Sequence, residues 1–169
     1  MATAALVSLE EYLQSSYEPD CDYVDGALEE RNLGDKGHSW LQKLLIKYLA
    51  LREEDWKVQV YPELRIRVSP KRVRIPDVCI FAESVEIDSV PTVPPLVCIE
   101  ILSPDDRWTR VERRIEDFLA MGVPHVWVFD PKEREVFDCS NAGNRLVKED
   151  VVEAPPVVIR LPELFAAKR

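Results

Sequence analysis

The chain has 169 residues, 46% of them hydrophobic and 31% charged, which is the size and composition of one folded domain over residues 1–169. Its formal net charge of −9 excludes the broad, non-specific coating of nucleic acid that a basic surface gives, although a small local basic site remains compatible with it. Neither a secretory leader nor an apolar run long enough to cross a membrane is found, so we expect a cytoplasmic protein without membrane attachment.

The N-terminal part of the sequence carries two short structural signals. Ser8 followed three residues later by Glu11 is typical of a capped helix start and predicts a helix over residues 8–14. Asp25-Gly26 stands between apolar positions, which is the strongest local signal for a tight turn between antiparallel strands. We therefore expect a β-hairpin around this turn.

Residues 36–52 are predicted to form the longest helix of the chain. Their apolar side chains recur at the spacing of one helix face: Leu41, Leu44, Leu45, Tyr48 and Leu49. His38 lies on the same side, in the first turn. A histidine in such a place is most often a boundary residue with its own partners, and the alternative is an auxiliary role in a functional site.

The pattern then changes to the alternation typical of strands, over residues 57–60 and 63–68. Basic residues follow one another from here toward the next strand: Arg65, Arg67, Lys71, Arg72 and Arg74. A solvated strand edge protected by charge is the commoner explanation for such a run. The alternative is an arm that follows a phosphate backbone, with Arg72 and Arg74 as the phosphate-contacting residues.

Two carboxylates stand in or beside apolar runs that are typical of buried strands. Asp77 lies at the start of one, and Glu100 lies within residues 96–102, which fit a central strand covered on both faces. A buried, ionised carboxylate is costly unless a cation or hydrogen bonds compensate it. Two such carboxylates that converge favour a divalent metal ion held by oxygen ligands. The same runs contain Cys79 and Cys98, which we interpret, with the other two cysteines, as reduced thiols.

The remaining residues mix strands and helices. Residues 83–95 contain three prolines and no helical period, so they are expected to form a surface connection. Trp108 and Trp127 are predicted to be core residues, not platforms for stacked bases. Further elements are expected in this order: a turn over 103–106 that starts a helix ending at Met121, a buried strand over 126–129, a strand over 133–139 in a hairpin with it, two weak strands, and a short helix over 162–167. The fold class is therefore α+β with a mixed sheet.

Four motifs occur in a fixed order, with the helix of His38 between the first two and a basic helix between the last two: DYVDG, IPDV, VCIEILSP and GVPHVWVFDP. Over residues 8–165 this order resembles the Uma family of "putative restriction endonucleases", within the PD-(D/E)XK nuclease superfamily. The resemblance implies a restriction-endonuclease-like fold, a mixed four-stranded sheet flanked by helices and extended here by N-terminal strands. It also implies Mg²⁺ or Mn²⁺ as the cofactor, DNA as the substrate and a homodimer as the assembly.

The same resemblance assigns the site residues. Asp77 and Glu100 correspond to the metal-binding, catalytic acids, and the backbone carbonyl of Ile101 is the candidate third oxygen ligand. The lysine of the superfamily's E-x-K motif falls at Leu102, which carries no charge. In the Uma relatives a lysine on the following helix takes its place, and the matching position here is Arg114.

Helical geometry supports Arg114 independently of the resemblance. One face of the helix carries the apolar side chains: Trp108, Val111, Ile115, Phe118 and Leu119. Arg114 lies at the border of that face, whereas Arg113 points toward solvent. An arginine can neutralise phosphate charge but cannot accept a proton from water, so water activation would rest on the metal. Alternatively, Arg114 is a structural partner of Glu100 or Asp77.

Two functions are compatible with these residues. The leading hypothesis is a metal-dependent DNA endonuclease with Asp77, Glu100 and Arg114 as its catalytic groups. The alternative is a nuclease-like binding or assembly module, catalytically weak or inactive, that keeps the acids for structure. Leu102, Arg114 and the acidic net charge favour this alternative.

Overall fold

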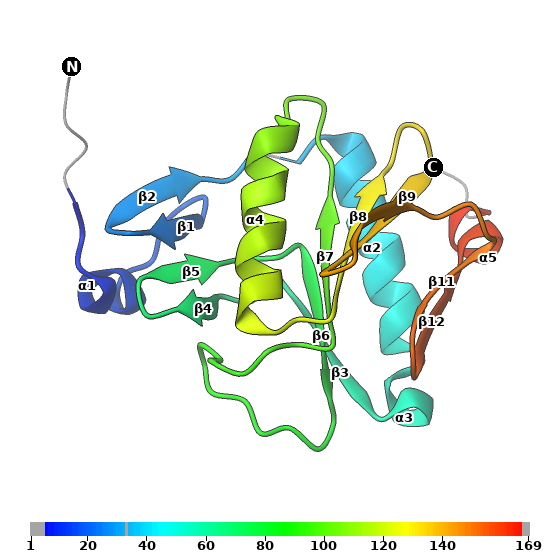
Figure 1. The fold of residues 1–169 in the computed structure, drawn as a ribbon, viewed down its shortest axis with the longest axis horizontal. Coiled ribbons are helices and arrows are strands. Elements are labelled where there is room, and N and C mark those ends of the chain that lie inside the picture. Colours follow the sequence, from blue (N-terminus) through cyan, green and yellow to red (C-terminus); the bar gives the residue numbers. More distant parts are fainter. Residues whose placement is uncertain (1–5, 33, 167–169) are drawn as a thin grey trace.

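The computed structural model describes residues 6–32 and 34–166. A six-stranded sheet with the order β10-β9-β8-β7-β6-β3 forms its centre (Figure 1). In that order the strands are Gly143–Leu146, Glu135–Ser140, His125–Asp130, Val97–Ile101, Val78–Ala82 and Val58–Pro62. β7 and β8 run parallel, whereas every other neighbouring pair is antiparallel. The sheet is thus mixed, as the sequence predicted.

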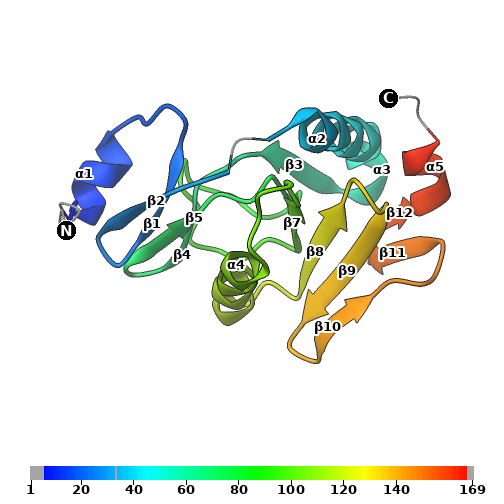
Figure 2. The ribbon, with the colours of Figure 1, turned by 90° about the horizontal axis from the view of Figure 1, so that it is seen from above.

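Further elements cover both faces of this sheet (Figure 2). α4 (Trp108–Met121) connects β7 to β8, because parallel neighbours need a crossover connection, and it lies on one face. On the opposite face lie α2 (Lys36–Ala50), the hairpin of β11 (Val151–Ala154) and β12 (Val157–Arg160), and α5 (Leu161–Phe165). This arrangement confirms the predicted α+β class. None of the helices within residues 6–32 and 34–166 is long and apolar enough to cross a membrane.

The N-terminal strands form a sheet of their own. Its four antiparallel strands have the order β2-β1-β5-β4 and the bounds Ala27–Glu30, Cys21–Val24, Arg72–Arg74 and Ile66–Ser69. The helix α1 (Leu9–Gln14) packs on it. The expected four-stranded central sheet with N-terminal extensions is therefore wrong in its partition. The reason is that β1 pairs with β5, with Tyr23 opposite Val73, and not with a strand of the central sheet.

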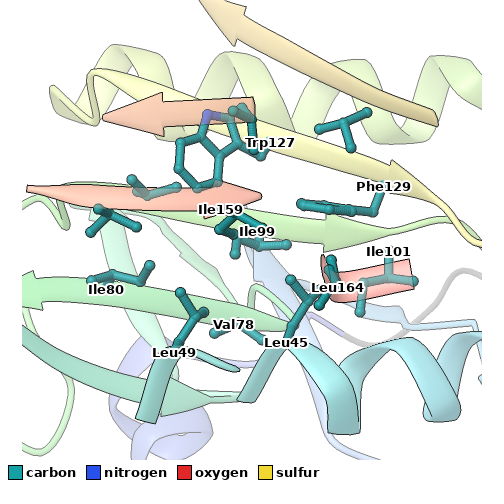
Figure 3. Packing of buried hydrophobic residues seen from close by; sticks show 14 of the residues in the cluster. Leu45, Leu49, Val78, Ile80, Ile99, Ile101, Trp127, Phe129, Ile159 and Leu164 are labelled. Atoms are coloured by element: carbon teal, nitrogen blue, oxygen red, sulfur yellow. The ribbon is translucent and has the colours of Figure 1, made fainter. Parts of the chain in front are cut away.

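The alternation of side chains along β7 separates the apolar core from the α4 face. Ile99 and Ile101 point toward α2, where they pack in one cluster with Leu45 (Figure 3). Cys98 and Glu100 alternate with them and so face α4. β7 is buried along its whole length, as expected for a central strand covered on both faces.

The two local signals near the N-terminus are confirmed. The Ser8 hydroxyl accepts a hydrogen bond from the backbone N–H of Glu11 at 3.1 Å and caps α1. Asp25 and Gly26 have φ values of 51° and 96°, which place both residues in the left-handed region that a tight hairpin turn requires.

Several element boundaries differ from the prediction. The long helix ends at Ala50, and a short helix α3 (Glu53–Trp56) follows it. The strand expected over 63–68 begins only at Ile66. The last helix ends at Phe165, and residue 167, its predicted end, lies outside the described residues.

α4 begins later than expected, which exposes its first side chain. The backbone N–H of Ser103 donates to the Asp106 carboxylate at 2.6 Å, so these residues close a turn before the helix. Trp108 is thereby the first residue of α4 and is 38% exposed, so its assignment to the core is wrong. Trp127 is fully buried, as predicted.

Leu45→Ala tests the packing of α2 on the sheet. Leu45 is fully buried, so we expect the substitution to lower the free energy of unfolding by about 2–5 kcal/mol through lost burial and a residual cavity. Leu51→Ala is the control, because Leu51 follows the same helix and is 73% exposed, and it should change stability by less than about 0.5 kcal/mol. Urea unfolding measures both. Equal losses would contradict this assignment of the inner face of α2.

Candidate active site

A small pocket of about 60 Å³ opens where the two sheets meet α2 and α4. Six of the residues that line it carry or can carry charge, and we call them the acid pocket: Asp22, Arg31, His38, Asp77, Glu100 and Arg114. They come from β1, from the segment after β2, from α2, from the residue before β6, from β7 and from α4. The fold therefore brings together the predicted acids, the predicted arginine and the predicted auxiliary histidine.

Asp77 is 4% exposed and every one of its carboxylate oxygens has a partner. Oδ1 accepts a hydrogen bond from Arg31 Nη2 at 2.9 Å, and Oδ2 accepts one from the backbone N–H of Ile101 at 2.7 Å. His38 Nε2 lies 3.3 Å from Oδ2. Burial raises the pKa of the Asp77 carboxyl, but His38 and Arg31 lower it by more, so the net shift is downward and the group stays ionised.

Glu100 is 7% exposed and is paired with Arg114. Arg114 Nη2 donates to Glu100 Oε1 at 2.8 Å and lies 3.1 Å from Oε2, and the same nitrogen donates to the carbonyl of Ile75 at 2.7 Å. Burial raises the pKa of Glu100, Arg114 opposes this and the charge of Asp77 adds to it, which brings the pKa to about 7. The two acids thus differ: Asp77 is held ionised, while Glu100 binds a proton readily near neutrality.

Asp22 links the pocket to the N-terminal sheet. One of its carboxylate oxygens accepts the backbone N–H of Ile75 at 3.1 Å. The other accepts from Arg74 Nη1 at 3.0 Å and also from Arg114 Nη1. A buried carboxylate on β1 therefore shares the Arg114 guanidinium with Glu100 on β7.

The predicted phosphate contacts at Arg72 and Arg74 do not fit their surroundings. Arg74 is 2% exposed and donates to Asp117 at 2.7 Å and to Glu29 at 2.8 Å in addition to Asp22, so a phosphate cannot reach it. Arg72 is bound at 2.7 Å both by Asp25 and by Asp117. Both arginines act within the fold as partners of carboxylates, and the alternating charge in the sequence did not show which residues face them.

His38 joins the acid pocket from the first turn of α2. The Asp35 carboxylate caps this helix by accepting the His38 N–H at 2.8 Å, which fixes the position of the ring next to Asp77. Burial lowers the pKa of His38, but the hydrogen bond and the charge of Asp77 outweigh it, so the pKa is raised.

Two residues of the acid pocket carried no signal that sequence reasoning used. Asp22 stands in the DYVDG motif, where the turn at Asp25 and Gly26 drew attention instead. Its burial between Tyr23 and Cys21 shows only in the structure. Arg31 follows β2 with no periodic pattern around it, so its contact with a residue 46 positions away could not be read locally.

The donor atoms of the acid pocket fit a hard divalent cation. Asp77 and Glu100 supply carboxylate oxygens, and Mg²⁺ characteristically binds one or two carboxylates and completes its shell with water and substrate phosphate. Among the described residues no group of three or more His, Cys, Asp or Glu side chains is arranged to hold a metal. Ile101 is tied to Asp77 through its N–H, and its carbonyl as a third ligand stays a prediction.

Comparisons with known proteins agree with the nuclease hypothesis at the level of family and fold. The family model Uma2, described as "Putative restriction endonuclease", matches residues 9–168. The crystal structure of a "putative nuclease" from Anabaena variabilis ATCC 29413 is similar with a TM-score of 0.81 and 24% sequence identity, over 95% of this chain and 98% of that one. At this identity the likeness shows the fold alone. No curated protein matches the chain.

Glu100→Gln tests the protonation of the buried acid. Because the pKa of Glu100 is about 7 in the fold against an ordinary value of 4.5, the folded state binds more protons than the unfolded state between these pH values. The wild type should therefore lose on the order of 2–3 kcal/mol relative to Glu100→Gln between about pH 5 and about pH 8. Urea unfolding at both pH values measures this difference.

Glu116→Gln is the matched control for that experiment, because Glu116 is exposed on α4. Its stability relative to the wild type should be nearly the same at both pH values. A Glu100→Gln difference that is also independent of pH would show that Glu100 does not take up a proton in this range.

Proposed function

The chain belongs to the Uma2 family, described as putative restriction endonucleases, and from this we propose that it is a metal-dependent nuclease that hydrolyses phosphodiester bonds in DNA. The observation that carries the proposal is the burial of Asp77 and Glu100 in one small polar pocket. Two carboxylates in such a place are costly without a compensating cation, and their oxygens are the donors that Mg²⁺ and Mn²⁺ prefer.

Each residue of the acid pocket has a role in this proposal. Asp77 and Glu100 would hold Mg²⁺ or Mn²⁺, with the carbonyl of Ile101 as a further oxygen ligand. When bound, the metal would lower the pKa of a bound water and neutralise charge on the phosphate. Arg31 and the Ile101 N–H orient the Asp77 carboxylate and keep it ionised, and His38 contacts it at the second oxygen.

Arg114 would supply a fixed positive charge beside Glu100. A guanidinium stays protonated throughout the functional pH range, so it stabilises negative charge on a phosphate but does not accept a proton from water. Leu102 occupies the position of the superfamily's lysine and offers no alternative base. The contacts with Asp22 and the Ile75 carbonyl hold the guanidinium in place, so its charge is positioned before a substrate arrives.

A basic track on α4 leads to the acid pocket. Arg107, Arg110 and Arg114 recur at intervals of three and four residues, so they lie along one side of the helix. Arg107 and Arg110 are exposed, and Arg110 also lines the pocket. This track, in place of Arg72 and Arg74, is our candidate for the local basic site that contacts the phosphate backbone.

We further propose that the chain acts as a homodimer. Cleavage of both strands of a duplex requires two sites, and two-fold pairing of identical chains is the commonest way to supply them. The cytoplasmic location expected from the sequence stays a prediction.

A second candidate function is a nuclease-like binding module without catalysis. It is favoured by the pairing of both acids with guanidinium groups, since Arg31 and Arg114 already compensate Asp77 and Glu100 without a metal. On this hypothesis Mn²⁺ at millimolar concentration would give no heat of binding in calorimetry and would produce no cleavage.

Nicking of supercoiled plasmid DNA tests the proposed function. With Mg²⁺ or Mn²⁺ the wild type should nick the plasmid, and Asp77→Asn and Glu100→Gln should each reduce the rate at least about 100-fold, because each removes a ligand charge. Asp88→Asn and Glu116→Gln are matched controls at exposed positions and should keep the wild-type rate. Equal nicking by all five proteins, or none by any of them, would overturn the assignment.

Arg114→Lys tests whether the arginine contributes charge alone. A lysine keeps the positive charge, so metal-dependent nicking should persist, whereas Arg114→Met should lose on the order of 10²–10³ in rate. Arg113→Met is the control, because Arg113 is an exposed neighbour on the same helix. Thermal unfolding of each variant separates lost charge from lost structure. Wild-type nicking by a folded Arg114→Met protein would remove Arg114 from the proposed site.

A further inference from the structure

A second and larger cleft adjoins the acid pocket. It has a volume of about 620 Å³, and its walls share Leu102, Ser103 and Asp106 with the acid pocket. We call it the tryptophan cleft and define it by its main lining residues: Lys36, Gly37, Trp40, Trp108, Pro131 and Lys132. Its volume lies within the roughly 300–1,000 Å³ typical of sites for small organic ligands.

Two tryptophans give this cleft an aromatic lining. Trp40 comes from α2 and is largely buried, while Trp108 opens α4 and is half-exposed. The Trp108 ring is fixed by a hydrogen bond from its Nε1 to Glu112 at 2.9 Å and by contact with Phe137, whose ring centroid is 5.6 Å away. A rigid, partly exposed indole is the kind of surface on which a nucleobase stacks.

The charge available in the tryptophan cleft is positive. Its carboxylates are engaged in the fold: Asp130 accepts the backbone N–H groups of Lys132 and Glu133 at 2.8 and 3.1 Å, and Asp35 caps α2. Lys36 forms no ion pair within the described part of the chain. The Lys132 ammonium lies 3.5 Å from an exposed Glu133 carboxylate, which is a weak surface contact.

We propose that the tryptophan cleft binds one unpaired nucleotide next to the phosphate in the acid pocket, with its base stacked on Trp108. This inference rests on the proposed nuclease function and specifies its substrate. The shared wall of Leu102, Ser103 and Asp106 places the two sites side by side, so neighbouring nucleotides of one strand can occupy both. Lys36 and Lys132 contact the flanking phosphates.

The stacking requirement selects the form of the nucleic acid. Inside a duplex both faces of each base are covered by neighbours, so a base can stack on Trp108 only where it has left the helix. The protein therefore prefers single-stranded, frayed or flipped substrates over intact duplex. Stacking tolerates any base, so this preference is for structure and not for sequence.

Fluorescence anisotropy with labelled oligonucleotides tests the inference without added metal, so that cleavage does not enter the readout. The probes are a twelve-nucleotide oligothymidylate, the same strand made of abasic sites, the matching duplex, and oligouridylate. Oligothymidylate should bind more tightly than the duplex and than the abasic strand. The oligouridylate arm distinguishes a site for DNA from one that accepts either nucleic acid.

Substitutions locate the binding in the tryptophan cleft. Trp108→Ala should weaken oligothymidylate binding by about 5- to 100-fold, as loss of one aromatic–base stack does, while Trp108→Phe should keep most of the affinity. Trp56→Ala, on α3 away from the cleft, is the control. Lys36→Ala with Lys132→Ala should lower the salt dependence of binding by about 0.7 per phosphate contact, and Lys71→Ala with Lys148→Ala should not.

Equal affinity for the abasic strand, tighter binding to the duplex, or unchanged binding by a folded Trp108→Ala protein would each overturn the inference. If Trp108→Ala does not fold, the abasic comparison and Trp108→Phe decide. Asp77→Asn should bind oligothymidylate like the wild type. A protein that binds as expected but nicks no plasmid would therefore keep the nucleotide site and lose the proposed catalysis.

Discussion

The guanidinium of Arg114 is the charge on which the candidate site depends. It contacts Glu100 on the central sheet, Asp22 on the N-terminal sheet and the backbone carbonyl of Ile75. A buried carboxylate that loses its partner costs about 3–5 kcal/mol, so each acid is tolerable in the fold only with this cation beside it. Arg31 does the same for Asp77. The two sheets are thus joined by balanced charge at the place where the pocket opens, in addition to their apolar contacts.

The half of the site that could be predicted has local patterns in the sequence. Asp77 and Glu100 stand out because each interrupts or borders an apolar run, and Arg114 because helix periodicity places it at the edge of an apolar face. Asp22 and Arg31 have no such pattern. Their importance comes from partners far along the chain, and a sequence read locally contains nothing that pairs them.

The fold shows the same division between local and distant causes. Capping at Ser8 and the turn at Asp25 depend on neighbours within a few residues, and both were predictable. The separate N-terminal sheet depends on the pairing of β1 with β5, which strand propensity alone does not specify. Arg74 was placed outside because alternation only separates two faces, and the carboxylates that bury it lie on other elements. Trp108 was misassigned because a turn delays the start of its helix.

The contact between Asp22 and Arg114 spans 92 residues of chain. Contacts of such span form slowly, because the entropy of a long loop must be overcome before they contribute. A nascent chain that has emerged from the ribosome only as far as β7 carries Asp22 and Glu100 but not the residue that neutralises them. Any activity of this pocket therefore begins only after synthesis has passed α4 and both sheets have closed on it, which keeps unfinished molecules inert.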